Sequence, residues 1–253
     1  MTVKELYKIL SDMIPAELSC SWDNDGLMCC PDGSREVGRV LVTLDVTDDA
    51  VNEAVAGGYD VIISHHPMIF KGLKAVSEDN FIAAKSIKLI KNNISVMSFH
   101  TRLDAVSGGV NDVLAALLGL SDVRSFGEEG IGRIGVLPCE MTLDAFAQTV
   151  KNTLSAPVVL CADAKKSVRR VAVLGGEGGD DIAAARAAGA DTYVSGRLGY
   201  HNMTDAPECD INLIEAGHFY TEFPVCKRLC EILAEIDGNI KTDIFCSNKI
   251  RAI

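Results

Sequence analysis

Residues 39–64 read RVLVTLDVTDDAVNEAVAGGYDVIIS, and this stretch decides the class of fold. Its two ends, residues 39–46 and 60–64, are short apolar runs rich in valine and isoleucine, which are typical of buried strands. Residues 48–58 between them begin with two aspartates and end with two glycines, a pattern that predicts a helix. A strand, a helix and a second strand in succession indicate a sheet that is at least partly parallel, with helices on its faces.

The same alternation continues in both directions from this stretch. Toward the N-terminus, Thr2 and Glu5 form a possible capping box for an amphipathic helix that ends before Pro15. Toward the C-terminus, the alternation is interrupted by the glycine-rich, charged segment SFGEEGIGR (125–133), which indicates a domain boundary. It then restarts and runs to a helix over residues 224–236 and a closing strand. The expected fold class is therefore α/β.

Composition narrows the class of protein. The hydrophobic fraction of 48% and the charged fraction of 23% are ordinary for a soluble globular chain. The N-terminal helix is amphipathic and contains acidic residues, unlike a secretory signal, so we expect a cytoplasmic protein without a membrane span. The net charge of −11 disfavours general nucleic-acid binding. Nine cysteines, an odd number without a Cys-x-x-Cys pair, predict buried free thiols rather than a disulfide framework or a zinc ribbon.

The histidines are the candidate functional residues. All five follow predicted strands in short polar segments, and two are followed by a carboxylate four residues later: His65, His66, His100 with Asp104, His201, and His218 with Glu222. Ligands of open α/β sheets bind beyond the carboxyl ends of the strands, which is where these side chains fall. A lone histidine after a strand is more often a hydrogen-bonded structural residue, but five in such places favour a metal site.

The adjacent pair His65 and His66 favours two ions over one. Successive side chains point to opposite sides of a strand, so the pair suits two neighbouring ions better than a single one. A bridging carboxylate would hold such ions ~3.5–4 Å apart, as in two-metal hydrolytic sites. Imidazole and carboxylate ligands suit zinc, manganese and iron, and the sequence leaves the identity of the metal open.

Five motifs resemble, in order and spacing, the Nif-three-like family, whose members are often described as GTP cyclohydrolase 1 type 2 homologues. They cover nearly the whole chain: WDNDGL (22–27), ISHHPMIF (63–70), SFHTRLDA (98–105), SGRLGYHN (195–202) and EAGHFYTE (215–222). The resemblance implies two divalent metal ions, zinc, iron or manganese, at five ligand positions: His65, His66, Asp104, His218 and Glu222. It implies that Glu222 or Asp104 bridges the ions, and that His100 and His201 line the same pocket. We expect these two histidines to support the ligands or to transfer protons rather than to bind the metal themselves.

The resemblance also implies the architecture and the assembly. It implies two α/β domains of mixed sheets flanked by helices, in a ring-shaped homohexamer, without the middle domain that longer members carry. Because His218 and Glu222 would have to meet the His65–His66 pair, we assign residues 1–126 with 217–253 to a metal-binding domain and 127–216 to a second domain.

Two functions fit these observations. The first is a metal-dependent hydrolase acting on a nucleotide-like small molecule, a cyclohydrolase or a phosphoesterase, in which the ions lower the pKa of a bound water toward ~7. Nothing in the residues selects GTP, which comes from the family alone. The alternative is a non-catalytic metal-binding scaffold or a regulatory interaction protein.

Other polar residues near the motifs are expected to have supporting or structural roles. We expect Trp22 in the core, Asp23 and Asn24 to orient a ligand histidine through its second ring nitrogen, and Asp25 to face solvent. Arg102, where the family usually has asparagine, would suit a phosphate-bearing ligand, but a solvated surface arginine is the expected state.

The glycine-rich stretch LGGEGGDD (174–181) resembles a phosphate loop only superficially. It lacks the G-x-G-x-x-G pattern, and its acidic residues would repel phosphate at the start of the following helix. A tight turn between a strand and a helix is therefore expected here.

Overall fold

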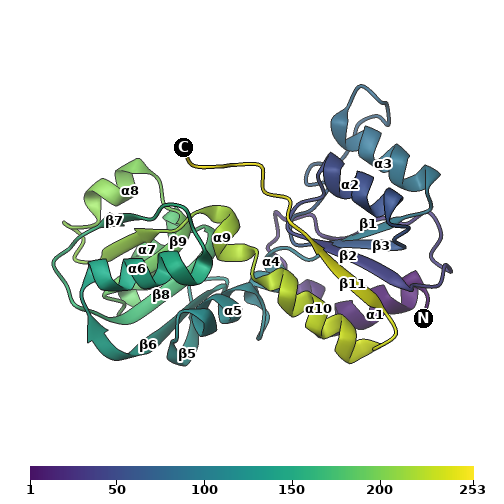
Figure 1. Cartoon of the computed structure of the whole chain (residues 1–253). Helices are drawn as coiled ribbons and strands as arrows, with labels where there is room; N and C mark the ends of the chain where they lie inside the picture. The colour runs from purple at the N-terminus through teal and green to yellow at the C-terminus, as the bar shows by residue number, and fades with distance from the viewer. The chain divides into compact units, whose positions relative to one another are not determined.

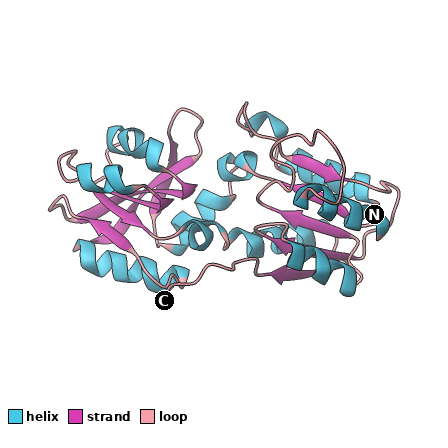
Figure 2. Ribbon diagram, turned by 90° about the horizontal axis from the view of Figure 1, so that it is seen from above, coloured by secondary structure: helices cyan, strands magenta, loops and turns pink.

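The computed structural model describes all 253 residues, which form two compact units. Unit 1 comprises Met1–Val106 and Cys226–Asn248, and unit 2 comprises Ser107–Val225 and Lys249–Ile253. Each unit contains one mixed sheet flanked by helices (Figures 1 and 2), so the predicted α/β class is confirmed. No helix of the chain combines the length and the apolar composition that a membrane crossing requires.

Unit 1 contains a five-stranded sheet in the order β1-β4-β3-β2-β11. Four of its strands are parallel, and β1 runs antiparallel to β4: β1 (Gly26–Cys29), β2 (Arg39–Thr43), β3 (Val61–Ser64), β4 (Ser95–Ser98) and β11 (Lys241–Phe245). Figure 1 shows α2 (Asp48–Ala56) and α3 (Phe81–Lys91) on one face of this sheet, and α1 (Val3–Met13) and α10 (Val225–Ile236) on the other. The strand–helix–strand unit predicted from residues 39–64 is thus confirmed as β2-α2-β3.

The strands of unit 1 read as continuous apolar runs because both of their faces are buried. Leu41, Ile62 and Val96 pack in one cluster with residues of α2 and α3. Their neighbours Val40 and Val61, which point to the opposite face, are equally buried. The predicted capping box of α1 is also present, since the Thr2 hydroxyl accepts from the Glu5 amide and the Glu5 carboxylate accepts from the Thr2 amide.

Unit 2 contains a six-stranded sheet in the order β5-β6-β8-β9-β10-β7. The three central strands are parallel and the other three run antiparallel to their neighbours: β5 (Ser121–Phe126), β6 (Gly132–Met141), β7 (Leu160–Ala162), β8 (Val168–Glu177), β9 (Thr192–Arg197) and β10 (Asn212–Glu215). Its faces are covered by α5 (Val110–Leu117) with α6 (Leu143–Leu154), and by α7 (Ile182–Ala187) with α8 (Tyr200–Asp205). As expected, a short turn with one 3₁₀ segment (Gly179–Asp181) joins β8 to α7.

The units break at other places than the predicted boundaries at residues 126 and 217. β5 pairs antiparallel with β6, so the glycine-rich segment between them is a hairpin connection inside unit 2 and not a domain linker. The short helix α9 (His218–Glu222) also belongs to unit 2. There the amide of Gly176, at the end of β8, donates to the Thr221 hydroxyl at 3.1 Å.

Candidate metal centre

The candidate site of unit 1 lies at the carboxyl ends of β3 and β4. His65 and His66 directly follow β3, and His100 follows β4 and precedes the short helix α4 (Thr101–Ala105), which carries Asp104. β3 and β4 are parallel neighbours with Ser64 opposite Ser98, so the two polar segments leave the sheet side by side. The strand-end placement predicted for these residues is confirmed.

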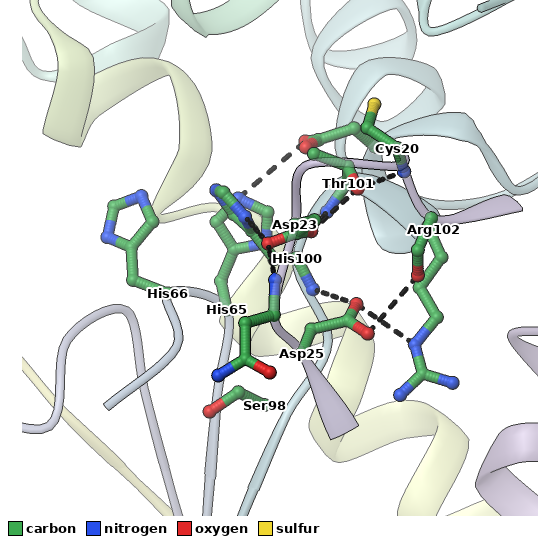
Figure 3. Close-up of polar contacts among 12 residues, drawn as sticks. Cys20, Asp23, Asp25, His65, His66, Ser98, His100, Thr101 and Arg102 are labelled. Carbon is green, nitrogen blue, oxygen red and sulfur yellow. Dashed lines mark hydrogen bonds and ion pairs between the residues drawn. The ribbon is translucent and has the colours of Figure 1, made fainter. Parts of the chain in front are cut away.

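Three imidazoles converge at this edge of the sheet. The ring centroids of His65, His66 and His100 are 5.0, 5.2 and 5.6 Å apart, pair by pair. Each ring contributes one nitrogen to a group whose atoms all lie within 4.8 Å of one another. Figure 3 shows the three rings side by side above the strand ends. The sequence prediction gave His100 a proton-transfer role, but its geometry suits a third imidazole ligand as well.

Hydrogen bonds fix the orientation and the tautomer of each ring. Nδ1 of His65 lies 3.0 Å from the carbonyl oxygen of Phe99, which can only accept, so Nδ1 is the donor. Nδ1 of His66 and of His100 bond carboxylates in the same way, Asp45 at 2.7 Å and Asp23 at 2.9 Å. In the neutral form each ring therefore presents an unprotonated Nε2, the state that ligates a divalent cation.

Asp104 adds a carboxylate to this group. Its Oδ1 lies 3.6 Å from Nε2 of His65, and both side chains are buried. An imidazole nitrogen and a carboxylate oxygen at this separation are both within reach of one cation, and together they form the donor set that zinc, manganese and iron accept. The donor chemistry of unit 1 therefore fits the implied metal.

The WDNDGL segment supports this group, with one expectation met and one not. Asp23 orients His100, and its other oxygen accepts from the amide and the hydroxyl of Thr101 (Figure 3). Burial opposes the ionisation of Asp23, but the hydrogen bonds from His100 and Thr101 outweigh it and hold the pKa of Asp23 well below its usual range. Asn24 does not contact a histidine, because its amide donates to the carbonyl of Ile69.

Asp25 and Arg102 form a buried ion pair, so the expectations of a solvent-facing aspartate and a surface arginine were wrong. Arg102 is only 1% exposed, and its Nε lies 3.0 Å from Asp25 (Figure 3). The guanidinium also donates to the carbonyl of Ile14 and lies 4.6 Å from the centre of the Phe99 ring. Asp25 in turn accepts from the amide of His100, so the pair braces the loop that carries the imidazole.

Trp22 was expected in the core, but it is 59% exposed. Its ring packs edge-on against Phe70 and His100, at centroid distances of 6.2 Å each. The only tryptophan of the chain therefore lies beside the imidazole group and not within a hydrophobic cluster.

The candidate residues of unit 2 lie on α9. Nε2 of His218 is 3.0 Å from Oε2 of Glu222, one helical turn away, and the glutamate is buried. The helix begins after Gly217, whose φ of 88° is readily adopted only by glycine. The structure thus brings His218 and Glu222 together within this unit. His201, on α8, is exposed, and its ring packs against Tyr200 rather than against this pair.

Comparison with known proteins identifies the family. Residues 1–252 match the sequence profile described as Duf34/NIF3 (NGG1p interacting factor 3). The chain belongs to the Duf34/NIF3 family. The resemblance inferred from the five motifs is confirmed, and the match extends over nearly the whole chain.

Relatives within the Duf34/NIF3 family agree with this assignment. A Clostridium acetobutylicum protein named GTP cyclohydrolase 1 type 2 homolog is 37% identical over 88% of this chain and 86% of its own length. A Clostridium perfringens protein of the same name is 33% identical over 95% of each chain. The crystal structure of the Staphylococcus aureus hypothetical protein SA1388 superposes with a TM-score of 0.90 at 28% identity, covering 100% of this chain and 99% of the other.

One residue of this Duf34/NIF3 site was missed in the sequence. Asp45, which orients His66, falls inside the apolar run assigned to the strand at residues 39–46. A single carboxylate next to the end of a buried run was the available signal, since such a residue sits at the same carboxyl edge as the histidines. The strand itself ends at Thr43, which leaves Asp45 beyond its end.

Proposed function

We propose that this Duf34/NIF3 protein is a dinuclear-metal-dependent hydrolase that acts on a nucleotide-like small molecule. The observation that carries the proposal is the group of three imidazoles, each held through Nδ1 by an acceptor and each contributing one ring nitrogen to a group whose atoms lie within 4.8 Å of one another. Structural histidines have no need of such convergence, whereas ligands of a divalent cation do. The names of the relatives, GTP cyclohydrolase 1 type 2 homolog, support a nucleotide-like substrate.

The proposed ligands come from both units. His65, His66 and Asp104 belong to unit 1, and His218 and Glu222 belong to unit 2. The family motifs support the assignment of all five to one dinuclear centre, with Glu222 or Asp104 as the bridge. The donor sets of the two units are chemically alike, imidazole with a buried carboxylate, as a shared pair of ions requires.

Bound ions would supply Lewis-acid chemistry and lower the pKa of a water molecule. The residues of the chain have separate tasks. The Asp23 carboxylate accepts a hydrogen bond from Nδ1 of His100 and fixes the ring, which leaves Nε2 as the atom at which His100 would accept and return a proton. His201, exposed on α8, is the second proposed proton-transfer residue.

The test combines elemental analysis with a nucleotide turnover panel before and after chelation. We expect about two metal ions per subunit, and turnover that is lost on chelation and restored by metal. His66→Ala and Glu222→Gln should each lower the metal content, because they are proposed to serve the same centre. His201→Asn is the matched control, expected to keep the metal and lower the turnover.

Three outcomes would count against parts of the proposal. Metal well below one ion per subunit in the purified protein would reject the centre. Metal that is lost in His66→Ala but not in Glu222→Gln would reject ligands from both units. Full metal content without turnover of any nucleotide would reject the hydrolase and favour a metal-binding scaffold. The homohexamer stays a prediction, which light scattering in solution tests.

A further inference from the structure

A cavity of about 270 Å³ opens beside His66 within unit 1. Three segments form its walls: residues 45–47 after β2, residues 66–70 after β3, and residues 81–85 at the start of α3. Because β2 and β3 are parallel neighbours, the first two segments leave the sheet at the same edge as the imidazole group. We call this cavity the His66 pocket. The proposed metal chemistry uses only two of its lining side chains, His66 and the Asp45 carboxylate that orients it.

Two phenylalanines line the pocket and are exposed to solvent. Phe70 is 43% exposed and Phe81 is 69% exposed, while Met68, in the same segment as Phe70, is buried. Exposed aromatic side chains that line a concave site are the usual means of holding a planar ring, because ring faces stack and exclude water. This pair therefore points to a ligand with an aromatic ring.

Lys85 supplies the cation of the pocket. Its half-buried ammonium donates to the carbonyl of Val46 at 2.6 Å and lies 5.4 Å from the centre of the Phe81 ring. An ammonium has three N–H donors, so further donors are available to a ligand. Burial lowers the pKa of Lys85, whereas the nearby carboxylates of Asp48 and Asp45 act in the opposite direction.

The charges around Lys85 decide which acceptor fits. Asp45 lines the same pocket, and Asp48 begins the helix α2 next to it. A phosphate dianion placed at Lys85 would be repelled by these two carboxylates, which offset the single positive charge. A neutral oxo group accepts the same hydrogen bond without this repulsion. The pocket thus favours an oxo-substituted ring over a phosphate.

We propose that the His66 pocket binds the heteroaromatic ring of the substrate, with a ring oxo group accepting from Lys85 and the ring faces held by Phe70 and Phe81. This inference rests on the proposed hydrolase and deepens it, since it assigns the base of the nucleotide-like substrate to residues that line the same pocket as His66. The phosphates then lie outside the pocket. Lys85 and Phe81 become the residues that determine base specificity.

The test is equilibrium binding of inosine and adenosine to the full-length protein as purified, by calorimetry or saturation-transfer NMR. The two nucleosides carry an oxo group and an amino group at the same ring position, and neither has a phosphate. We expect inosine to bind at least about tenfold more tightly, and Lys85→Met to remove this difference without changing adenosine binding. Phe81→Ala, at an exposed position, should weaken both by about tenfold.

Lys88→Met is the matched control, because Lys88 lies one turn further along α3, is exposed, and does not line the pocket. It should change neither affinity. Equal affinities of the two nucleosides for the wild type, or an inosine preference that survives in Lys85→Met, would overturn the proposal, as would the absence of binding at millimolar concentration. Inosine binding that depends on Lys85 without metal-dependent turnover would reject the hydrolase alone. Metal-dependent turnover without the inosine preference would reject the pocket alone.

Discussion

The two units place their histidines by opposite means. In unit 1, His65, His66 and His100 follow parallel strands and are held by added groups, a carbonyl and two carboxylates. In unit 2, His218 and Glu222 lie on the short helix α9, which packs closely against the sheet at two glycines. A Cβ on Gly176 would lie 2.1 Å from Oε1 of Glu222, and one on Gly196 would lie 2.7 Å from the Cα of His218.

The difference explains the glycine-rich stretch at the end of β8. Its resemblance to a phosphate loop is superficial, because Gly176 has a φ of 71° and its missing side chain makes room for the Glu222 carboxylate. The stretch is therefore a packing site for α9, which we call the glycine cradle. In unit 2 the absent side chain of Gly176 leaves the space that positions Glu222. In unit 1 Asp23 and Asp45 position His100 and His66 by hydrogen bonds.

The largest expected effect tests whether the imidazole loop of unit 1 depends on its buried ion pair. Arg102→Met leaves the Asp25 carboxylate buried without its partner, and we expect a loss of about 3–5 kcal/mol in the free energy of unfolding. Urea denaturation followed by the fluorescence of Trp22, which reports on unit 1, measures it. Lys8→Met, which removes the exposed Lys8–Asp12 pair, should change stability by less than about 0.5 kcal/mol.

The corresponding pair of unit 2 sharpens this test. Arg133 is also buried and meets Asp112 through two hydrogen bonds of 2.8 and 3.2 Å. Arg133→Met should lower the free energy of unfolding to a similar extent, and circular dichroism is the measurement that follows the unfolding. A loss below 1 kcal/mol in Arg102→Met would contradict the structural role given to the pair.

The second prediction concerns the cradle of unit 2. Gly176→Ala adds both backbone strain and a clash with Glu222, and should lower stability by about 2–4 kcal/mol and release the metal. Gly199→Ala is the control, since Gly199 has a φ of 84° but open space around its missing Cβ. The Gly199→Ala variant should lose only about 1–2 kcal/mol in the free energy of unfolding and should keep the metal. Equal metal content in the two variants would show that Glu222 is not a ligand.

The third prediction concerns the supporting carboxylates of unit 1. Asp45→Ala removes the acceptor that orients His66, and we expect metal affinity to fall about 10–100-fold. Competition with a chromophoric chelator measures this affinity. Asp12→Ala, at an exposed position of α1, is the control and should leave the affinity unchanged. An affinity within twofold of wild type in Asp45→Ala would mean that His66 needs no such support.

The sequence was sufficient where the determining pattern is local. Apolar runs of four to eight residues predicted the strands, and the rule that polar residues collect at their carboxyl ends placed His65, His66 and His100 correctly. The Arg102–Asp25 pair could not be foreseen, because its members are 77 residues apart and the local pattern of each is that of a surface residue. The unit boundary was missed for a related reason. A glycine-rich hairpin and a glycine-rich linker have the same composition, and only the pairing of β5 with β6 distinguishes them.

The smallest expected effect is chemical, and it compares the thiols of the two units. The three cysteines of unit 2, Cys139, Cys161 and Cys209, are all exposed, whereas in unit 1 Cys29 and Cys226 are buried. Burial, with a smaller contribution from Cys30, raises the pKa of Cys29 to about 11. At pH 8 only about 0.1% of such a thiol is thiolate, against roughly a quarter of an ordinary one, so alkylation of Cys29 should be slower by at least two orders of magnitude.

Iodoacetamide labelling of the native protein at pH 8, read by peptide mass spectrometry, checks this order. Cys139 and Cys209 should be alkylated first, and Cys29 and Cys226 only after denaturation. Cys246 is exposed although it belongs to unit 1, so its labelling at the rate of the unit 2 thiols separates burial of the individual side chain from protection of the whole unit. Rapid labelling of Cys29 in the native protein would mean that the β1 edge of the sheet opens readily, and that the imidazoles beside it rest on a less rigid support than their hydrogen bonds indicate.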